Sequence, residues 1–258
     1  MPLELKNQIA LITGASSGIG RATAELLASE GVNLILIARR EDKINEITNN
    51  LRKKHNIKIF TKKVDIRNYS EVKTFYNGIP EEFKNISILV NNAGLAKGLN
   101  SLQDGNVEDW ETMIDTNIKG LLYITRLVVP EMIKNNSGHI INIGSIAGRE
   151  TYPNGNIYCA TKHAVAALTK ALRIDLNGKN IRVTTIDPGM VETEFSIVRL
   201  GNKEKADMVY MNMNPLKAID IAECIIFALK RPKHVNIQEI LVMPTDQANA
   251  TIVNKREE

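Results

Sequence analysis

A tyrosine and a lysine four residues apart carry the strongest chemical signal in the sequence. Tyr158 and Lys162 stand in the run Tyr-Cys-Ala-Thr-Lys, and a spacing of four places both side chains on one face of a helix, one turn apart. A free tyrosine has a pKa of about 10, and a nearby ammonium favours the phenolate. We therefore expect Lys162 to lower the pKa of Tyr158, so that this tyrosine donates and accepts a proton near neutral pH.

Ser145 and Asn117 are candidate partners of this pair. Ser145 closes the apolar run 140–144, and the carboxyl ends of parallel strands are where open α/β sheets bind ligands. Its hydroxyl would bind the substrate oxygen and stabilise the charge that develops there, although a serine at a strand end is often only a turn residue. Asn117 is a poor helix former within a helical pattern. It marks either a local kink or a bound water that resupplies protons through Lys162.

A glycine-rich turn lies between the first strand-like run and the first helix-like run, with the spacing G-x-x-x-G-x-G. Glycines there permit a tight turn and a close approach of the backbone to a pyrophosphate, whose charge then meets the positive end of the helix. Glycines in a turn can also be purely structural, but the position in a first strand–helix–strand unit favours phosphate binding. The candidate residues are Gly14, Ser16, Ser17, Gly18, Ile19 and Gly20.

Two arginines follow the second strand-like run. An enzyme that uses NAD would carry a carboxylate near this point to bind the ribose hydroxyl, but the sequence reads Ala38, Arg39, Arg40. A guanidinium offers a fixed positive charge and planar donors that suit a phosphate. An exposed basic pair would look the same. The missing acid and the position together predict NADP(H) as the cofactor.

Apolar runs that read as strands alternate with amphipathic runs that read as helices. The expected strands are 8–13, 33–38, 57–64, 86–90, 139–144, 181–186 and 239–243; the expected helices are 19–30, 42–54, 70–77, 107–134, 157–177 and 219–230. This alternation predicts one α/β domain over residues 1–258, with a doubly wound, seven-stranded parallel sheet. Residues 189–214 form the least regular stretch, and we expect them to act as a substrate loop or lid.

Composition excludes several classes of protein. The net charge is only +4, and Lys and Arg are scattered, so no nucleic-acid partner is expected. Cys159 and Cys224 lie far apart, and the four histidines lack ligand spacing, so no metal is expected. A catalytic thiol at Cys159 is not expected either, because it lacks a recognisable base partner. No apolar run approaches membrane-spanning length and the start lacks a signal-peptide pattern. The sequence thus predicts a cytoplasmic protein with no membrane partner.

Together these motifs resemble the short-chain dehydrogenase/reductase family, over nearly the whole chain. The turn, Asn91-Asn92-Ala93-Gly94, Asn117, Ser145, Tyr158 with Lys162, and Asp187-Pro188-Gly189 occur in the family's order and spacing. The resemblance implies a Rossmann-type fold and a homotetramer. It implies that Lys162 also bonds the nicotinamide ribose. Further cofactor contacts implied by it are Asn91, Asn92, Ala93 and Gly94 on the adenosine side, Asp65 and Ile66 at the adenine, and Pro188, Gly189, Val191 and Thr193 at the nicotinamide.

A narrower similarity concerns the substrate. Segments 108–120, 138–145, 193–199 and 234–237, with Met243-Pro244, look like the NADP-dependent 3-hydroxy acid dehydrogenases. That group includes enzymes named for serine, allo-threonine and malonic semialdehyde, and sulfoacetaldehyde reductases are related to it. The resemblance implies a small substrate bearing a carboxylate, which needs a cation in the site. Arg199 is the first candidate and Arg149 the second, although Arg199 could instead be exposed or pair with Glu194.

The sequence therefore predicts an oxidoreductase that moves a hydride between NADP(H) and a small 3-hydroxy acid or its 3-oxo acid or semialdehyde. Ser145 and Tyr158 would hold the reacting oxygen. Alternatives are a different carbonyl substrate (sulfoacetaldehyde, a carrier-bound 3-ketoacyl group, a sugar or an apolar ketone) and a non-catalytic NADP-binding regulator. The complete set of acid–base residues speaks against the regulator, because a sensor does not need them.

Overall fold

A seven-stranded parallel sheet forms the centre of the molecule, in the order β3-β2-β1-β4-β5-β6-β9. The computed structural model describes residues 3–256. The strands are β1 (Ile9–Thr13), β2 (Asn33–Ala38), β3 (Ile59–Lys63), β4 (Ile88–Asn91), β5 (Gly138–Ile143), β6 (Ile181–Pro188) and β9 (Glu239–Val242). Each bound lies within two residues of the expected one. The prediction of a single α/β domain with this sheet is confirmed.

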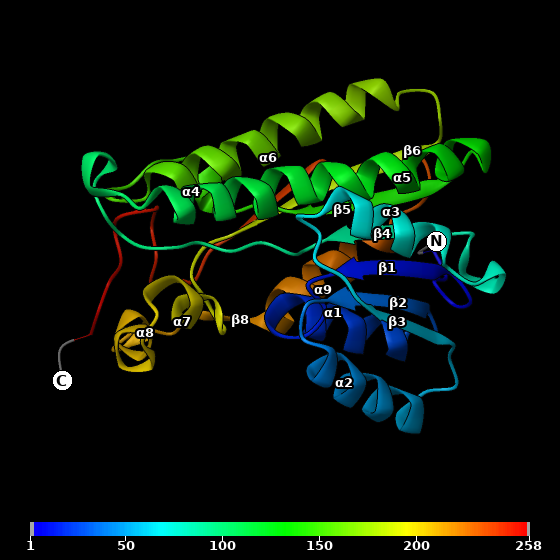
Figure 1. The fold of residues 1–258 in the computed structure, drawn as a ribbon, viewed down its shortest axis with the longest axis horizontal. Helices are drawn as coiled ribbons and strands as arrows, with labels where there is room; N and C mark the ends of the chain where they lie inside the picture. Colours follow the sequence, from blue (N-terminus) through cyan, green and yellow to red (C-terminus); the bar gives the residue numbers. More distant parts are fainter. Residues whose placement is uncertain (1–2, 257–258) are drawn as a thin grey trace.

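Helices cover both faces of the sheet (Figure 1). One face carries α1 (Gly18–Ser29), α2 (Glu41–Lys54) and α9 (Ala218–Leu229); the other carries α3 (Tyr69–Asn77), α5 (Leu121–Lys134) and α6 (Asn156–Asp175). Side chains alternate along each strand, so Ile12 enters one hydrophobic core and its neighbour Leu11 enters the other. The central strands are therefore apolar on both faces. Within residues 3–256, none of the helices combines the length and the apolar character that crossing a membrane requires.

The expected long helix over 107–134 is interrupted. It consists of α4 (Val107–Ile114), a π-helical turn η3 (Asp115–Gly120) and then α5. A π-helical turn adds a residue to the helix and commonly occurs at functional sites. Asn117 lies within η3, which supports the local-kink interpretation of this residue. The expected helix is thus two helices joined by a π-helical turn.

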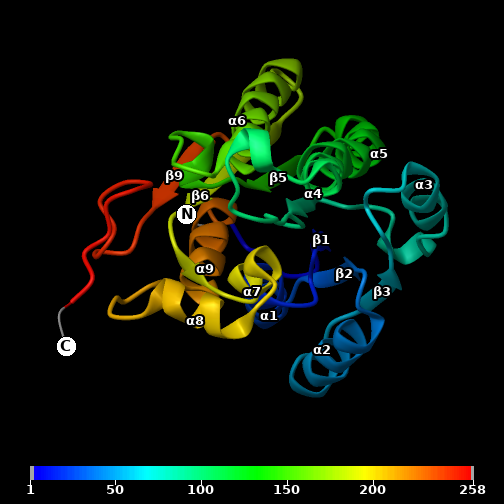
Figure 2. The ribbon, with the colours of Figure 1, turned by 60° about the vertical axis from the view of Figure 1, so that its left-hand side comes forward.

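The segment 189–214 is more regular than expected. It contains β7 (Val191–Glu192), α7 (Phe195–Leu200) and α8 (Lys203–Tyr210), and β7 pairs with β8 (Leu216–Lys217). The two short helices lie beyond the ends of α1 and α9, next to the C-terminal segment (Figure 2). Two hydrogen bonds join that segment to the residues after α8: Arg256 N–H donates to the Asn212 carbonyl at 2.8 Å, and the Asp246 carboxylate accepts from Asn214 N–H at 2.7 Å. Three short helices, η1 (Glu81–Phe83), η2 (Leu102–Asp104) and η4 (Ile146–Gly148), complete the described chain.

Candidate active site

A cavity of about 780 Å³ opens at the carboxyl ends of the strands, between the sheet and α7. It brings together most of the predicted site residues. Those that line it are Gly14, Ser16, Ser17, Gly18, Ile19, Arg39, Arg40, Asp65, Ile66, Asn92, Ala93, Gly94, Ser145, Tyr158, Lys162, Pro188, Gly189, Val191, Thr193 and Arg199. Gly20, Asn91, Asn117 and Arg149 lie outside the lining. Residues from six strand ends and from the segment 189–214, called the lid below after its expected role, thus share one space.

The glycine-rich turn is packed against the residues that follow β4. Gly14 has a left-handed φ of 65°, and a Cβ added there would lie 2.9 Å from the Ala93 Cα. The Asn92 amide donates to the carbonyls of Thr13 at 2.9 Å and Gly14 at 3.1 Å. A Cβ on Gly20 would lie only 2.4 Å from that same amide nitrogen. Gly20 is therefore required for this packing.

The N-terminus of α1 fits an anion. Ser17 is its N-cap residue, yet among residues 3–256 no side chain caps the helix, and the first turn carries no carboxylate. The Ser17 hydroxyl instead accepts a hydrogen bond from Arg40 at 2.7 Å. The free N–H groups and the positive end of the helix dipole face the cavity, where a pyrophosphate would satisfy both.

Four charged side chains gather beside this turn. Arg39 is exposed at the cavity rim, and Arg40 reaches Ser16 at 3.2 Å as well as Ser17. Glu194 accepts hydrogen bonds from Lys43 at 2.6 Å and from Arg40 at 2.7 Å. The Lys43 hydrogen bond, together with Arg40, lowers the pKa of Glu194 to about 2. Sequence reasoning missed Lys43 and this role of Glu194; the available signal was that Lys43 follows Arg40 by three residues at the start of a helix.

Asp65 and Ile66 line the cavity as the family pattern implies. The Asp65 carboxylate is engaged by Arg67 at 2.5 Å, which lowers its pKa. Ile66 packs against Gly120 of η3, where an added Cβ would lie 2.5 Å from the Ile66 Cδ1. This wall of the cavity is therefore fixed by contacts within the chain.

Tyr158 and Lys162 lie on one face of α6, as the spacing predicted. Both are at least 90 % buried, and the Lys162 Nζ lies 5.9 Å from the centre of the tyrosine ring. Nζ donates to the Ile143 carbonyl at 2.9 Å. A Cβ added to Gly94 would lie 3.6 Å from Nζ and 3.3 Å from the Asn117 Oδ1, so these three residues meet at one point.

The pKa of Tyr158 was expected to be lowered by Lys162, but within the protein alone it is raised. Burial raises the pKa of Tyr158 well above its usual range, and Tyr152 adds to this, while Ser145 and Arg199 act in the opposite direction. Burial also lowers the pKa of Lys162, to about 8, against the opposing charge of Asp187. Desolvation of both groups therefore outweighs the attraction that the sequence argument considered.

Asn117 acts on the backbone of the loop after β4. Its amide accepts from Leu95 N–H at 2.9 Å and donates to the Leu95 carbonyl at 2.8 Å, with a further bond to Thr161 at 3.0 Å. Asn91 is similarly committed to Thr125 and Asn142, at 3.0 and 2.9 Å. Neither asparagine lines the cavity, and both form hydrogen bonds that fix the neighbouring segments in place.

Arg199 of α7 lies beside Tyr158. Its guanidinium carbon lies 5.5 Å from the Tyr158 ring centre and 5.4 Å from that of Tyr152, and Nη1 donates to the Tyr152 hydroxyl at 3.0 Å. Tyr152 also lines the cavity and was missed by sequence reasoning. Arg199 thus places a half-buried guanidinium beside Tyr158 in the cavity.

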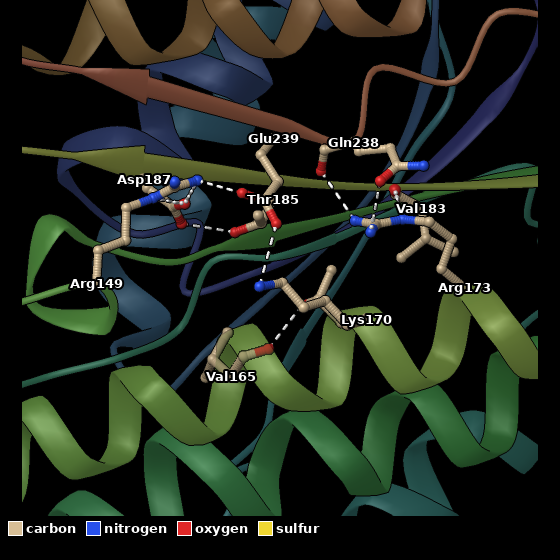
Figure 3. A network of polar contacts seen from close by, with 10 residues as sticks. Arg149, Val165, Lys170, Arg173, Val183, Thr185, Asp187, Gln238 and Glu239 are labelled. Carbon is tan, nitrogen blue, oxygen red and sulfur yellow. Dashed lines mark hydrogen bonds and ion pairs between the residues drawn. The ribbon is translucent and has the colours of Figure 1, made fainter.

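Arg149, the second candidate for a substrate cation, is committed elsewhere (Figure 3). Its Nε donates to Asp187 at 2.8 Å, and Nη2 donates to Glu239 at 2.6 Å. A guanidinium held by two carboxylates outside the cavity lining has neither the position nor the free charge to bind a substrate acid group. Arg149 therefore lies outside the cavity lining, whereas Arg199 is part of it.

Two other chemistries find no support in the site. Among residues 3–256, no three His, Cys, Asp or Glu side chains gather as a metal ion would require. Cys159 is buried, and burial raises the pKa of its thiol, which disfavours a nucleophilic thiolate. Ser145, Tyr158 and Lys162 line the cavity together.

Comparison with known proteins agrees with this arrangement. The chain is 45% identical over 255 residues to an NADP-dependent 3-hydroxy acid dehydrogenase of Schizosaccharomyces pombe, covering 98% of each protein. It is 44% identical to sulfoacetaldehyde reductase 2 of Chromohalobacter salexigens, covering 94% of this chain and 96% of that protein. A solved structure, the closed form of serine dehydrogenase complexed with NADP+, superposes with a TM-score of 0.91 at 42% identity, over 97% of this chain and all of that one.

The family model for short chain dehydrogenase matches residues 8–203, which include the glycine-rich turn, Asn117, Ser145, Tyr158 and Lys162. The resemblance inferred from the motifs is confirmed. The chain belongs to the short-chain dehydrogenase family.

Proposed function

We propose that this protein is an NADP(H)-dependent oxidoreductase that interconverts a small 3-hydroxy acid and the corresponding 3-oxo acid or semialdehyde. The observation that carries the proposal is the Arg199 guanidinium 5.5 Å from the Tyr158 ring centre, inside one cavity. A substrate whose oxidisable carbon is β to an acidic group can place its oxygen at Tyr158 and its acid at Arg199. The 45% identity to a 3-hydroxy acid dehydrogenase supports the same substrate class.

The residues of the cavity fit NADP(H). The uncapped N-terminus of α1 suits the pyrophosphate, and Arg39 and Arg40 suit the 2′-phosphate. Asp65, Ile66 and the residues from Asn92 to Gly94 would border the adenosine; Pro188, Gly189, Val191 and Thr193 would border the nicotinamide. When bound, the nicotinamide supplies or accepts the hydride.

The side chains of the protein would hold the substrate and move the proton. Ser145 and Tyr158 hydrogen-bond the reacting oxygen, and in the reducing direction the Tyr158 hydroxyl donates its proton to that oxygen. Lys162, positively charged when its buried amine is protonated, favours the phenolate that remains and bonds the nicotinamide ribose. Asn117 keeps the loop after β4 in place beside Lys162. Oxidation of the alcohol reverses each step.

A sulfonate substrate is the main alternative within this chemistry. Sulfonate and carboxylate are both anions that a guanidinium binds, and sulfoacetaldehyde reductase 2 is 44% identical to this chain.

We also propose that the protein forms homotetramers through the long helices α5 and α6. Three apolar side chains on these helices, Leu122, Ile133 and Ile174, expose 40%, 39% and 76% of their surface.

A spectrophotometric assay of NADP(H) tests the proposal. We expect turnover of serine, allo-threonine, 3-hydroxypropanoate or 3-hydroxyisobutyrate with NADP+, and of the matching semialdehydes with NADPH. Sulfoacetaldehyde, a sugar and an apolar ketone complete the panel. Preference for an apolar ketone over every acid would refute the substrate class. Cofactor binding without turnover of any member would favour a non-catalytic NADP-binding regulator.

A further inference from the structure

The backbone that follows β6 borders the cavity at the point where it leaves the sheet. The last pair in the register between β6 and β9 joins Pro188 to Val242. Gly189 N–H still donates to the Val242 carbonyl, at 2.7 Å. Because β9 ends at Val242, the partner of the next backbone donor, Met190 N–H, has to come from elsewhere in the chain.

A side chain 57 positions farther along the chain supplies that partner. The Gln247 Oε1 accepts a hydrogen bond from Met190 N–H at 2.8 Å. Gln247 is only 5% exposed, and its Nε2 donates to the Asn249 carbonyl at 3.0 Å. Because the amide nitrogen is engaged by a carbonyl, the amide oxygen is the end that faces Met190. Gln247 thus takes the place of a neighbouring strand.

Gly189 leaves room for this side chain. A Cβ added there would lie 2.4 Å from the Gln247 Oε1, 2.8 Å from the Met243 Sδ and 3.0 Å from the Pro244 Cδ. The φ of Gly189 is not in the left-handed region. The close approach of Gln247, and not the backbone conformation, is therefore what a side chain at this position would oppose.

The C-terminal segment, residues 243–256, reaches the cavity at a second point. Ala250 lines the cavity together with Gln247. Its N–H donates to the Glu150 carboxylate at 2.9 Å. Gln247 also pairs with Val253 in an antiparallel bridge within the segment. The segment therefore holds Gln247 beside the cavity through contacts of its own.

We propose that Gln247 is a positioning residue for the nicotinamide end of the cofactor: its side-chain oxygen fixes Met190 N–H, and with it the backbone from Pro188 to Val191. The proposal rests on the proposed function, in which this backbone borders the nicotinamide. Hydride transfer needs the reacting atoms in a near-attack geometry, and a misplacement of about 1 Å can cost on the order of 10²-fold in rate. Gln247 does not have to touch the cofactor for this role.

Two substitutions separate the two hydrogen bonds of Gln247. Gln247→Met has a similar volume and removes both. Gln247→Glu keeps an acceptor for Met190 N–H, but its carboxylate has no donor for the Asn249 carbonyl. If the bond to Met190 is the important one, Gln247→Glu retains the function; if Gln247 only folds the C-terminal segment, both variants lose it.

The binding of two ligands, measured by calorimetry, tests the proposal. NADPH fills both ends of the proposed site, whereas adenosine 2′,5′-bisphosphate lacks the nicotinamide end. In Gln247→Met, we expect Kd for NADPH to rise about tenfold and Kd for adenosine 2′,5′-bisphosphate to stay within about twofold. The kcat should fall about tenfold or more in the same variant. Gln247→Glu should recover both quantities to within about threefold of the wild type. Equal changes for the two ligands, or a Gln247→Glu variant as impaired as Gln247→Met, would overturn the proposal.

Asn249→Ala is the matched control. The Asn249 Oδ1 accepts from Thr251 N–H and Ile252 N–H, at 2.8 and 2.7 Å, in a turn of the same segment. Its loss should lower Tm and leave Kd for NADPH within about twofold. A rise as large as that in Gln247→Met would also overturn the proposal.

A second variant covers a failure of Gln247→Met to fold, which thermal unfolding would reveal. Gln247→Asn keeps a polar amide but is one methylene shorter, so it should lose the bond to Met190 and give the same pair of Kd values. Binding needs no turnover. A wild-type protein that binds NADPH but reduces nothing would therefore refute the proposed function and leave this comparison of ligands intact.

Discussion

The two sides of the cavity are built differently. On the sheet side, Asn117, Ser145, Tyr158 and Lys162 are all at least 90% buried. The side chains of Asn117, Ser145 and Lys162 each hydrogen-bond to a backbone group. On the lid side, Glu194 joins Arg40 and Lys43 through ion pairs whose side chains remain about 40% exposed. The side chains on the sheet side are buried, whereas those on the lid side form ion pairs that remain partly exposed to solvent.

The two sides of the cavity are therefore expected to have different roles, one in the reaction and the other in substrate and cofactor preference. Buried hydrogen-bonded groups are costly to move, because a buried polar group left without its partner destabilises the folded protein by about 1–3 kcal/mol. Exposed ion pairs contribute only about 0–1 kcal/mol and rearrange easily. We infer that the sheet side determines the chemistry, whereas the lid side, with Arg199 and Glu194, determines which substrate and cofactor are accepted. Each prediction below tests one side of this division.

Tyr158→Phe should have the largest effect. Loss of the hydroxyl removes the proton donor, and general acid–base catalysis contributes about 10²- to 10⁴-fold, so kcat should fall by that factor. NADPH binding, followed by fluorescence, should remain within about twofold. Tyr123→Phe, on α5 beside Tyr69, is the control and should leave kcat unchanged. Retention of more than a tenth of wild-type kcat in Tyr158→Phe would remove this residue from the mechanism.

Arg199→Met tests the lid side through the substrate. A hydrogen bond to a charged group contributes about 1.5–3 kcal/mol, so KM for a 3-hydroxy acid should rise about 10- to 100-fold. KM for a ketone without an acidic group should change little, and so should kcat for that ketone. Lys203→Met removes a cation from the start of α8 that pairs with Asp207 outside the cavity, and it serves as the control. Equal effects on acidic and neutral substrates would mean that Arg199 only supports α7.

The sequence was sufficient for the sheet side because its signals are local. Tyr158 and Lys162 share a helix turn, Ser145 follows a strand, and alternation of apolar runs predicts the parallel sheet. Parallel strand ends necessarily converge at one edge, so residues placed there by pattern alone were expected to meet. The direction of the Tyr158 pKa shift was not predictable, because it depends on burial by side chains from distant segments.

Contacts that join residues distant in the sequence were less predictable, on both sides of the cavity. Lys43 and Glu194 are 151 positions apart, and Arg149 is 90 positions from Glu239. From sequence alone, an arginine that faces a cavity and an arginine that pairs with two carboxylates look the same. Arg149 and Arg199 were both proposed for the substrate, and only the fold separates them. The interruption of the helix at Asn117 was foreseen as a kink but not as a π-helical turn.

Arg39→Asp tests the preference for the cofactor phosphate. The exposed guanidinium at the rim would be replaced by a carboxylate that repels the 2′-phosphate and suits a ribose hydroxyl. The ratio of kcat/KM for NADPH to that for NADH should fall by about tenfold or more. Lys233→Asp, an exposed position far along the chain, makes the same change of net charge and should leave the ratio unaltered. An unchanged ratio in Arg39→Asp would assign the phosphate to other groups.

Glu194→Gln should give the smallest effect, and its sign is informative. Glu194 partly neutralises Arg40 and Lys43, which under the proposed function lie beside the 2′-phosphate. Its removal should therefore lower KM for NADPH about two- to fivefold, more at low than at high ionic strength. KM for NADH should not change. Because the pKa of Glu194 is lowered to about 2, the carboxylate stays ionised across the assay range, and the effect should be equal at pH 6 and pH 8. Glu192→Gln, which removes a neighbouring exposed carboxylate that pairs with Lys217, is the control. If KM rose equally for both cofactors, Glu194 would only hold the lid in place, and its charge would not determine the preference for NADPH.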